Sequence, residues 1–246
     1  MSDSYRRRRT ISSTTIGDVA TIDGVFAEFL DEGRARLSER SYQQYEQVIE
    51  LFAMSMNGYA PNALTDDEFE RWQERFETDE LSAFTGLFGP DKIAENVGEF
   101  LDYFMIRKVM ARKELLESAG TVTAKLADWL ASNGHVDATT AAVMVDQGSE
   151  ASTELPALDK LADLLYDDAE RLPEFDAADI PDEHWIDDYL TIVKVEPGAL
   201  WFEGLDAPLA VSTRTSKAAQ PGWTVNVEAV KLDGRWHAAE VGKVYP

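Results

Sequence analysis

The chain contains no cysteine among its 246 residues. This absence excludes disulfide bonds, thiolate nucleophiles and zinc or iron–sulfur sites built on cysteine, and it favours an intracellular protein. No run of 18 apolar residues occurs either, so we expect no segment that spans a membrane. An arginine run near the N-terminus is followed by TISSTTIGDVATIDG, which is too polar for an export signal. We therefore expect a cytoplasmic protein without a membrane partner.

Lysine is also scarce, with 9 lysines beside 14 arginines, and 46 acidic residues stand against 23 basic ones. The formal net charge is -23. This composition resembles that of proteins from salt-loving microbes, whose cytoplasm holds molar salt. At about 1 M salt the Debye length is only about 3 Å, so repulsion among carboxylates is screened. An acidic surface that mimics a binding partner is the alternative, and the composition leaves both interpretations open.

Sequence motifs of common enzymes are missing as well. The chain has no Gly-rich phosphate-binding loop, no Gly-x-Ser-x-Gly and no His-Glu-x-x-His. His184 lies among Asp182, Glu183, Asp187 and Asp188, a set of ligands that suits a divalent ion. Such clusters arise by chance in a chain with 46 acidic residues. We predict no catalytic residue, no metal site and no cofactor.

Charge divides the chain into unequal parts. Residues 1–9 carry four arginines against Asp3, a net charge of +3. Residues 10–184 hold 13 basic and 37 acidic residues, a net of -24, and residues 185–246 hold 6 and 8, a net of -2. Together with hydropathy, this predicts four parts: a basic N-terminal tail, a helical bundle, an acidic linker with one amphipathic helix, and a small β-barrel, over residues 1–23, 24–136, 137–184 and 185–246. An ordinary further bundle helix is the alternative to the linker.

Apolar residues at three- and four-residue spacing predict helices before residue 136. The expected helices cover residues 24–37, 39–58, 66–76, 91–118 and 121–132. Ser38 is suited to cap the second helix and Gly58 to close it, while Thr65 followed by Glu68 has the capping-box pattern. The longest predicted helix carries four basic residues among acidic ones, and we expect ion pairs within that helix. They are Arg107, Lys108, Arg112 and Lys113.

The last part of the chain changes to a period of two, which predicts β-strands. The expected strands are DYLTIVKVE, ALWFE, LAVS, GWTVNVEAVKL and RWHAAEV. Pro197-Gly198 suits a type II turn, Asp233-Gly234 is a strong hairpin signal, and STRTSKAAQP is expected to be a loop. The predicted fold class is α+β, an N-terminal all-α bundle followed by a five-stranded antiparallel barrel that is SH3-like or OB-like.

Residues 24–57 resemble the first helices of the core-binding domain of tyrosine recombinases. The resemblance lies in a Phe-x-x-Phe-Leu opening and a Ser-x-x-Ser-Tyr-x-x-Tyr helix, within VFAEFLDEGRARLSERSYQQYEQVIELFAMSMNGY. No histidine of this chain begins the family's His-x-x-Arg motif, so the resemblance implies a helical fold and no recombinase chemistry. The helical half followed by PGALWFEG and PGWTVNVEAVKLDGRWHAAEVGKVYP is similar to prokaryotic, notably haloarchaeal, proteins that end in such a barrel. That second resemblance implies no activity.

These features favour a non-enzymatic binding or adaptor protein that contacts nucleic acid or a ribonucleoprotein. Guanidinium groups suit phosphate oxygens, and exposed aromatic rings stack on bases. The expected contact residues lie in the tail, the predicted loop and the barrel: Arg6, Arg7, Arg8, Arg9, Arg214, Lys217, Trp201 and Trp236. Trp223 shares a strand face with valines and is expected in the core. The alternative is a protein–protein scaffold that binds through the acidic bundle or a barrel edge and contacts no nucleic acid.

Overall fold

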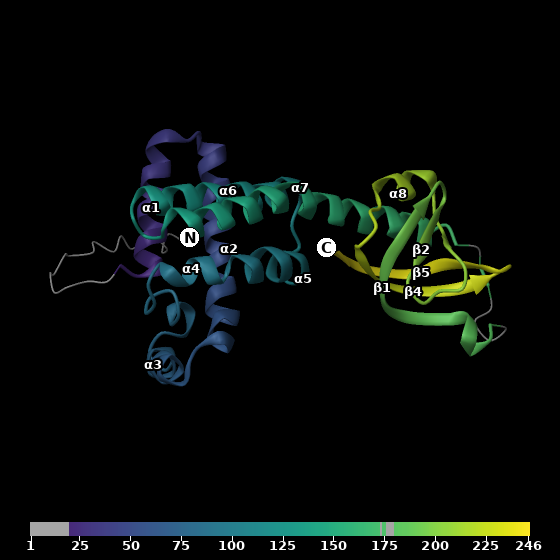
Figure 1. Cartoon of the computed structure of the whole chain (residues 1–246), viewed down its shortest axis with the longest axis horizontal. Helices are drawn as coiled ribbons and strands as arrows, with labels where there is room; N and C mark the ends of the chain where they lie inside the picture. The colour runs from purple at the N-terminus through teal and green to yellow at the C-terminus, as the bar shows by residue number, and fades with distance from the viewer. Residues whose placement is uncertain (1–19, 173, 176–179) are drawn as a thin grey trace, which may run out of the picture.

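The protein has an α+β fold in which the helices come first and the sheet last (Figure 1). The computed structural model describes residues 20–172, 174–175 and 180–246. The molecule is elongated, with α1 and α2 toward one end and the sheet at the other (Figure 1). The α+β class and the order of helices followed by a five-stranded sheet are therefore confirmed, whereas the antiparallel arrangement is corrected below. The four tail arginines, Arg6 to Arg9, lie outside the described residues.

The first two helices pack against each other through aromatic residues. α1 covers Ile22–Arg36 and α2 covers Glu39–Tyr59. The Ser38 hydroxyl accepts a hydrogen bond from the backbone N–H of Ser41, which confirms the predicted cap. Gly58 lies within α2 instead of closing it, and the chain continues as a short 3₁₀ helix, η1, Ala60–Ala63. Phe52 is fully buried and stacks on Phe100 at 4.5 Å between ring centroids.

The third helix, α3, covers Asp66–Phe76 and begins with the predicted capping box. The Thr65 hydroxyl accepts from the Glu68 N–H at 3.4 Å, and the Glu68 carboxylate accepts from the Thr65 N–H at 3.0 Å. This backbone hydrogen bond from Thr65, aided by Lys92, lowers the pKa of Glu68. No residue of α3 is buried. The first turn of α3 is therefore stabilised by local hydrogen bonds and not by burial in the core.

The single long helix predicted over residues 91–118 is wrong, because the chain breaks several times there. It forms α4, a π-helical segment η3 and α5, then leaves the helical path at residues 108–112 before α6 begins. Their bounds are Asp91–Glu95, Glu99–Phe104, Met105–Arg107 and Lys113–Ser132. Five residues of η3 and α5 are buried. The change to π-helical geometry interrupts the regular i→i+4 hydrogen bonds of the segment, which a single apolar period in the sequence does not reveal.

Residues 138–169, assigned above to an acidic linker, form the 32-residue helix α7, Ala138–Ala169. The Asp137 carboxylate caps it, accepting from the N–H groups of Thr139 and Thr140. α7 packs along α6 and also contacts the last strand of the sheet, so it runs from the helical half to the sheet (Figure 1). Acidic residues occupy its exposed face while leucines occupy the core, which is why a charge count alone suggested a linker.

Close contact between α6 and α7 depends on two glycines. A Cβ atom at Gly120 would lie 2.3 Å from the Gly148 carbonyl oxygen, and one at Gly148 would lie 2.7 Å from the Gly120 carbonyl oxygen. Both contacts are with backbone atoms, which no side-chain rearrangement relieves. The bare backbones of the two helices thus lie against each other, as small residues allow.

The sheet contains five strands and is mixed, which corrects the antiparallel prediction. Adjacent strands follow the order β1-β2-β3-β5-β4, and β4 pairs back to β1, so the sheet closes on itself. Four pairs are antiparallel, whereas β3 and β5 are parallel. Strand directions cannot alternate around a closed ring with an odd number of members, so one parallel pair is unavoidable. The strands cover Trp185–Glu196, Ala199–Phe202, Leu209–Ala210, Thr224–Leu232 and Arg235–Tyr245.

Local turn signals in the sheet were predicted correctly. Asp233 and Gly234 have φ values of 48° and 79° and join β4 to β5 in a hairpin.

The stretch expected to be a loop contains a short helix instead, α8, Thr213–Ala218. The Ser212 hydroxyl caps α8 by accepting from the Thr215 N–H. Two further 3₁₀ segments complete the chain, η2 at Glu80–Ser82 and η5 at Asp182–His184.

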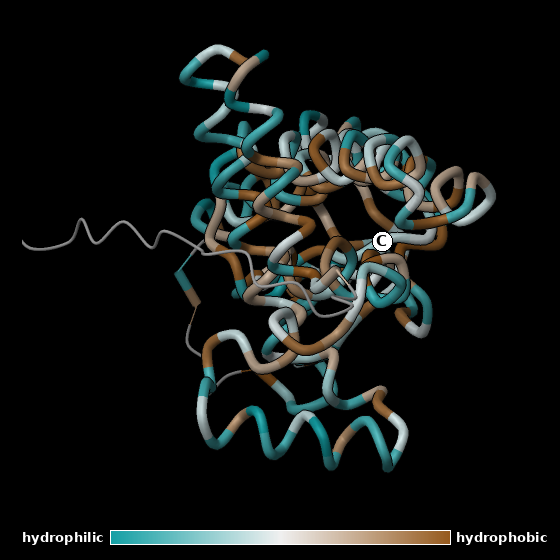
Figure 2. The backbone as a smooth tube through the Cα atoms, turned by 90° about the vertical axis from the view of Figure 1, so that its left-hand side faces the viewer, coloured by the Kyte–Doolittle hydropathy of each residue, from teal (hydrophilic) through white to brown (hydrophobic). Residues whose placement is uncertain are grey.

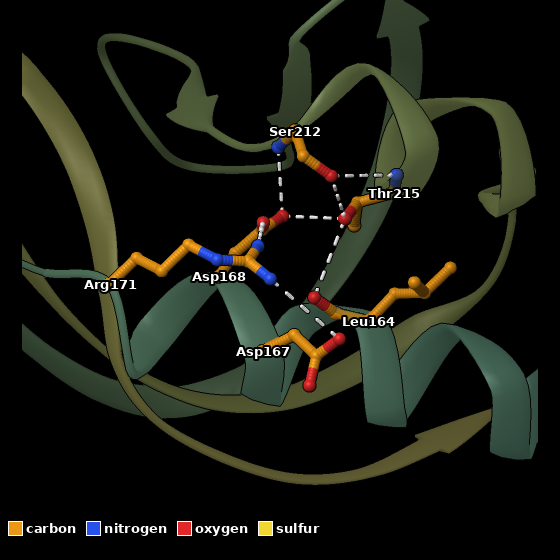
Figure 3. A network of polar contacts seen from close by, with 6 residues as sticks. All are labelled: Leu164, Asp167, Asp168, Arg171, Ser212 and Thr215. Atoms are coloured by element: carbon orange, nitrogen blue, oxygen red, sulfur yellow. Dashed lines mark hydrogen bonds and ion pairs between the residues drawn. The ribbon is translucent and has the colours of Figure 1, made fainter.

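One carboxylate connects the end of α7 to the start of α8 (Figure 3). Asp168 accepts from the Ser212 N–H at 2.8 Å and from the hydroxyl of the buried Thr215. Its other oxygen lies 3.1 Å from the Arg171 guanidinium. The Thr215 hydroxyl also lies 3.4 Å from the Leu164 carbonyl oxygen. These contacts fix the sheet to the C-terminal end of the long helix.

We expect Asp168→Ala to lower the free energy of unfolding by about 1–3 kcal/mol, because two donors in the junction lose their acceptor. The matched control is Asp167→Ala, whose half-exposed carboxylate lies 4.0 Å from Arg171. An exposed ion pair of this kind contributes little. Urea unfolding of both variants provides the measurement. Equal losses in the free energy of unfolding would contradict a stabilising role for the hydrogen bonds of Asp168.

Candidate functional site

The tryptophan predicted for base stacking at position 236 belongs to the core of the sheet. Trp236 is 5% exposed, and its indole N–H donates to the Asp206 carboxylate at 3.1 Å. The Lys231 ammonium lies 5.8 Å from its ring centroid. Hydrogen bonds from Lys231 and Trp236 lower the pKa of Asp206. A base could reach this ring only if the sheet opened.

Trp201 lies on the outer side of β2 and is half-buried. Its indole N–H donates to Glu196 at 2.8 Å, and the Lys194 ammonium lies 5.7 Å from its ring centroid. Arg214 and Lys217 are exposed on α8, not on a loop. Trp201 thus lies on a strand, whereas the basic pair lies on the helix between β3 and β4. The predicted site is therefore brought together only in part.

The start of the described chain lies far from the sheet, which bears on the prediction that the tail and the sheet bind nucleic acid together. The described chain begins beside α1, at the end of the molecule opposite the sheet (Figure 1). Arg214 and Lys217 lie at the sheet end. A nucleic acid bound by both the tail arginines and the sheet would have to extend along the length of the helical half.

A groove between α2 and α3, which we call the α2–α3 groove, gathers several exposed apolar side chains of the helical half. Its volume is about 530 Å³. Four of the large apolar side chains along it are exposed to solvent: Met54 (60%), Phe69 (43%), Phe76 (36%) and Leu81 (87%). Trp72 and Asn57 also line the groove. Contiguous exposed apolar side chains of this size are a common mark of binding surfaces.

The aromatic row on α3 forms one wall of the α2–α3 groove. Trp72 lies between Phe69 and Phe76, at 5.2 Å and 5.0 Å between ring centroids. Its indole N–H is buried and has no hydrogen-bond partner among the described residues. In Figure 2, α3 is the lowest layer, stands apart from the main helical layers and is mostly hydrophilic in colour. The row is therefore held by ring contacts on a helix that meets the main core through the partly buried Trp72 and has no fully buried residue of its own.

Residues 66–81, which run along the α3 side of the α2–α3 groove and which we call its acidic rim, are rich in carboxylates, and Glu80 among them lines the groove. Residues 66–81 hold eight acidic and two basic residues, a net charge of -6. Two of these carboxylates are paired, Glu68 with Lys92 and Asp79 with Arg75, each at 3.2 Å. Four others are exposed and form no ion pair with any described residue: Glu70, Glu74, Glu77 and Glu80. An apolar floor beside an acidic rim suits a partner that is apolar on one side and basic at its edge.

A second cluster joins the two halves of the protein. The Arg107 guanidinium carbon lies 4.4 Å from the Tyr245 ring centroid, 5.3 Å from that of Tyr103 and 5.9 Å from that of Tyr189. Burial raises the pKa of Tyr245, while the nearby guanidinium opposes the rise. Arg107 therefore contacts tyrosine rings and not the helix acids predicted for it. Because its rings come from both halves, we interpret the cluster as a structural contact between the helical half and the sheet.

The described residues contain neither a metal-binding cluster nor a membrane-spanning helix. Within residues 20–172, 174–175 and 180–246, no group of three or more His, Cys, Asp or Glu side chains is placed to hold a metal ion. In the same ranges no helix combines the length and the apolar character needed to cross a bilayer. No family model, curated protein or solved structure matches the chain. The resemblance to recombinases and to haloarchaeal proteins thus stays a prediction.

Sequence reasoning missed the α2–α3 groove, although a signal was present. The apolar residues of α3 recur at helical spacing, and we took them to face a core. The same helix has seven charged residues among its 11, so an aromatic row was its only apolar surface. Leu81 carried no signal at all, because it follows the helix in an irregular segment. Its exposure depends on how η2 is placed beside α3.

Proposed function

We propose that this chain is a non-enzymatic adaptor protein that binds a segment of another protein in the α2–α3 groove. The observation that carries the proposal is the gathering of Met54, Phe69, Phe76 and Leu81 around one groove while each remains exposed. The bound segment is an amphipathic one, with an apolar face on the groove floor and basic residues toward the acidic rim. Helix-in-groove recognition of this kind uses apolar anchors on one helix face.

Apolar burial and charge both favour the binding of an amphipathic segment in the groove. Burying apolar surface contributes roughly 25 cal/mol per Å², and aromatic side chains dominate the energetics of protein interfaces. The aromatic row is already ordered by tilted ring contacts on both sides of Trp72, so less side-chain freedom remains to be lost on binding. The acidic rim contributes specificity and association rate more than affinity, and this contribution falls with added salt. Affinity at high salt therefore rests on the apolar floor.

Contact with nucleic acid is the second candidate, and the connectivity of the sheet favours it. The closed order β1-β2-β3-β5-β4, with α8 between β3 and β4, supports a small barrel that is OB-like and not SH3-like. OB-like barrels commonly bind oligonucleotides across their second and third strands. Here Trp201 lies on β2 beside Lys194, with Arg214 and Lys217 on α8. The tail arginines and a cytoplasmic, salt-adapted setting are further parts of this proposal.

Two designed helical peptides test the groove. One combines leucine with lysine, the other leucine with glutamate, in the same amphipathic order and length. We expect the leucine–lysine peptide to bind at least tenfold more tightly by isothermal titration calorimetry, because only its charges complement the rim. The double variant Phe69→Ser/Leu81→Ser should lose this binding. Val193→Ser, which removes a 53%-exposed apolar side chain on β1, should not change it.

Equal affinity for the two peptides, or full binding by the groove variant, would contradict the adaptor proposal. The same protein samples address the second candidate when single-stranded oligonucleotide replaces the peptide. If nucleic acid is the partner, Arg214→Ser/Lys217→Ser should weaken binding for all sequences and flatten its dependence on salt, since fewer counterions are released. The groove variant should leave oligonucleotide binding unchanged.

A further inference from the structure

We propose that the chain's own N-terminal segment, residues 4–12, occupies the α2–α3 groove and thereby competes with the groove's partner. The inference rests on the proposed function, since it assigns a regulator to the same groove. Three observations carry it: where the described chain begins, how far the preceding residues reach, and the match between their chemistry and that of the groove.

The described chain begins within two hydrogen bonds of the groove. The Asp23 N–H donates to the Thr85 carbonyl oxygen at 3.0 Å. The Thr85 hydroxyl in turn accepts from the Asn57 side-chain amide at 2.9 Å, and Asn57 lines the groove. Asn57 also accepts from the Phe84 and Thr85 N–H groups, so this connection is fixed on both sides. The described chain therefore starts next to the groove and at the end of the molecule opposite the sheet (Figure 1).

The tail is long enough to enter the groove. Arg9 precedes Ala20, the first described residue, by 11 residues. At 3.3–3.6 Å per residue, these span at most about 36–40 Å. A segment tethered this closely has an effective concentration on the order of millimolar. Even a weak contact, with a dissociation constant in the high micromolar range, is then formed most of the time.

The chemistry of residues 4–12, SYRRRRTIS, complements that of the groove. Its four arginines are opposite in charge to the rim, whose exposed carboxylates Glu70, Glu74, Glu77 and Glu80 form no ion pair with a described residue, and its Tyr5 and Ile11 are apolar enough for the floor. The rim segment, residues 66–81, has a net charge of -6, whereas the whole last part of the chain, residues 185–246, has a net charge of -2. Electrostatic attraction and proximity thus both favour the groove over the sheet.

Competition is measured with the leucine–lysine peptide on the full-length chain. We expect the variant with Arg6, Arg7, Arg8 and Arg9 replaced by serine to bind this peptide at least threefold more tightly than the unchanged chain. If the segment fills the groove two thirds of the time, only one third of the molecules are free to bind, and removing the competitor restores the rest. Replacing Arg214 and Lys217 instead should leave the affinity unchanged.

The position of the segment is measured separately. Because the chain has no cysteine, Ser4→Cys gives a single attachment point for a nitroxide spin label. We expect the label to broaden the amide resonances of Met54, Phe69 and Leu81, and the broadening to fall in the variant without the four arginines, which supplies the random-chain background. Broadening that is the same in both proteins, or strongest on β2 and α8, overturns the inference.

The two measurements keep the two proposals distinguishable. If the peptide binds with the same affinity with and without the arginines, the regulatory inference fails while the groove remains a binding site. If the label broadens groove resonances but the leucine–lysine peptide binds neither protein, the adaptor proposal fails and the groove serves the chain's own segment alone.

Discussion

Gly120→Ala should lower the free energy of unfolding by about 3 kcal/mol or more, as overpacking at a backbone contact does in its severe cases. The added Cβ would lie 2.2 Å from the Ser152 backbone nitrogen and 2.3 Å from the Gly148 carbonyl oxygen. Since neither atom can rotate away, α6 and α7 would have to separate, and this helix pair supports both the helical half and the contact with β5. Urea unfolding followed by circular dichroism measures the loss.

The matched control is Gly58→Ala on α2, where a Cβ meets no atom within 4 Å. Alanine is preferred to glycine inside a helix, so this variant should gain about 0.5–1 kcal/mol. The two substitutions are chemically identical and differ only in what surrounds them. If Gly120→Ala costs less than about 0.5 kcal/mol, the close packing of α6 on α7 is contradicted.

Raising potassium chloride from 0.1 to 2 M should raise the unfolding temperature by about 10 °C or more, equivalent to about 3–5 kcal/mol for a chain of this length. The reason is the net charge of -23, whose self-repulsion is screened at high salt. One local example is a row of acids across the sheet, in which Asp187 pairs with Glu228 and Glu228 with Glu240. Like charges directly opposite each other destabilise a sheet.

Glu228→Gln isolates the local part of this salt effect. The variant should be more stable than the parent at 0.1 M salt and lose that advantage at 2 M, because the repulsion that it removes is already screened there. A non-ionic osmolyte at matched osmolarity controls for effects unrelated to charge. An unfolding temperature that does not change with salt would favour the other interpretation of the composition, a surface kept acidic for binding.

What the sequence predicted well was local. The Thr65–Glu68 capping box and the Asp233-Gly234 hairpin are each fixed by residues within three positions of one another, so the chain carries the whole signal. The hydrophobic period likewise separated helices from strands, and it placed Trp223 in the core, where it is 5% exposed. These elements need no information about distant parts of the chain.

What the sequence could not predict depended mostly on distant contacts. A single apolar period does not reveal the π-helical geometry of η3, and the parallel pairing of β3 with β5 joins Leu209 to Trp236 across 27 residues. The predicted base-stacking site depended on distant contacts in the same way. The sequence left open whether Trp236 is buried or exposed on its strand, and neighbouring strands bury it, while Leu81 gives no signal of its exposure.

The long helix α7 also sets a fixed spacing. Its 32 residues, at 1.5 Å each, measure about 48 Å. It lies against α6 over its first part, contacts β5, and is fixed to α8 by Asp168 at its end. A molecule held in the α2–α3 groove and another held on the sheet would thus be bound toward opposite ends of the protein (Figure 1). The helical half would act as a spacer between two partners, and small partners would be held without touching.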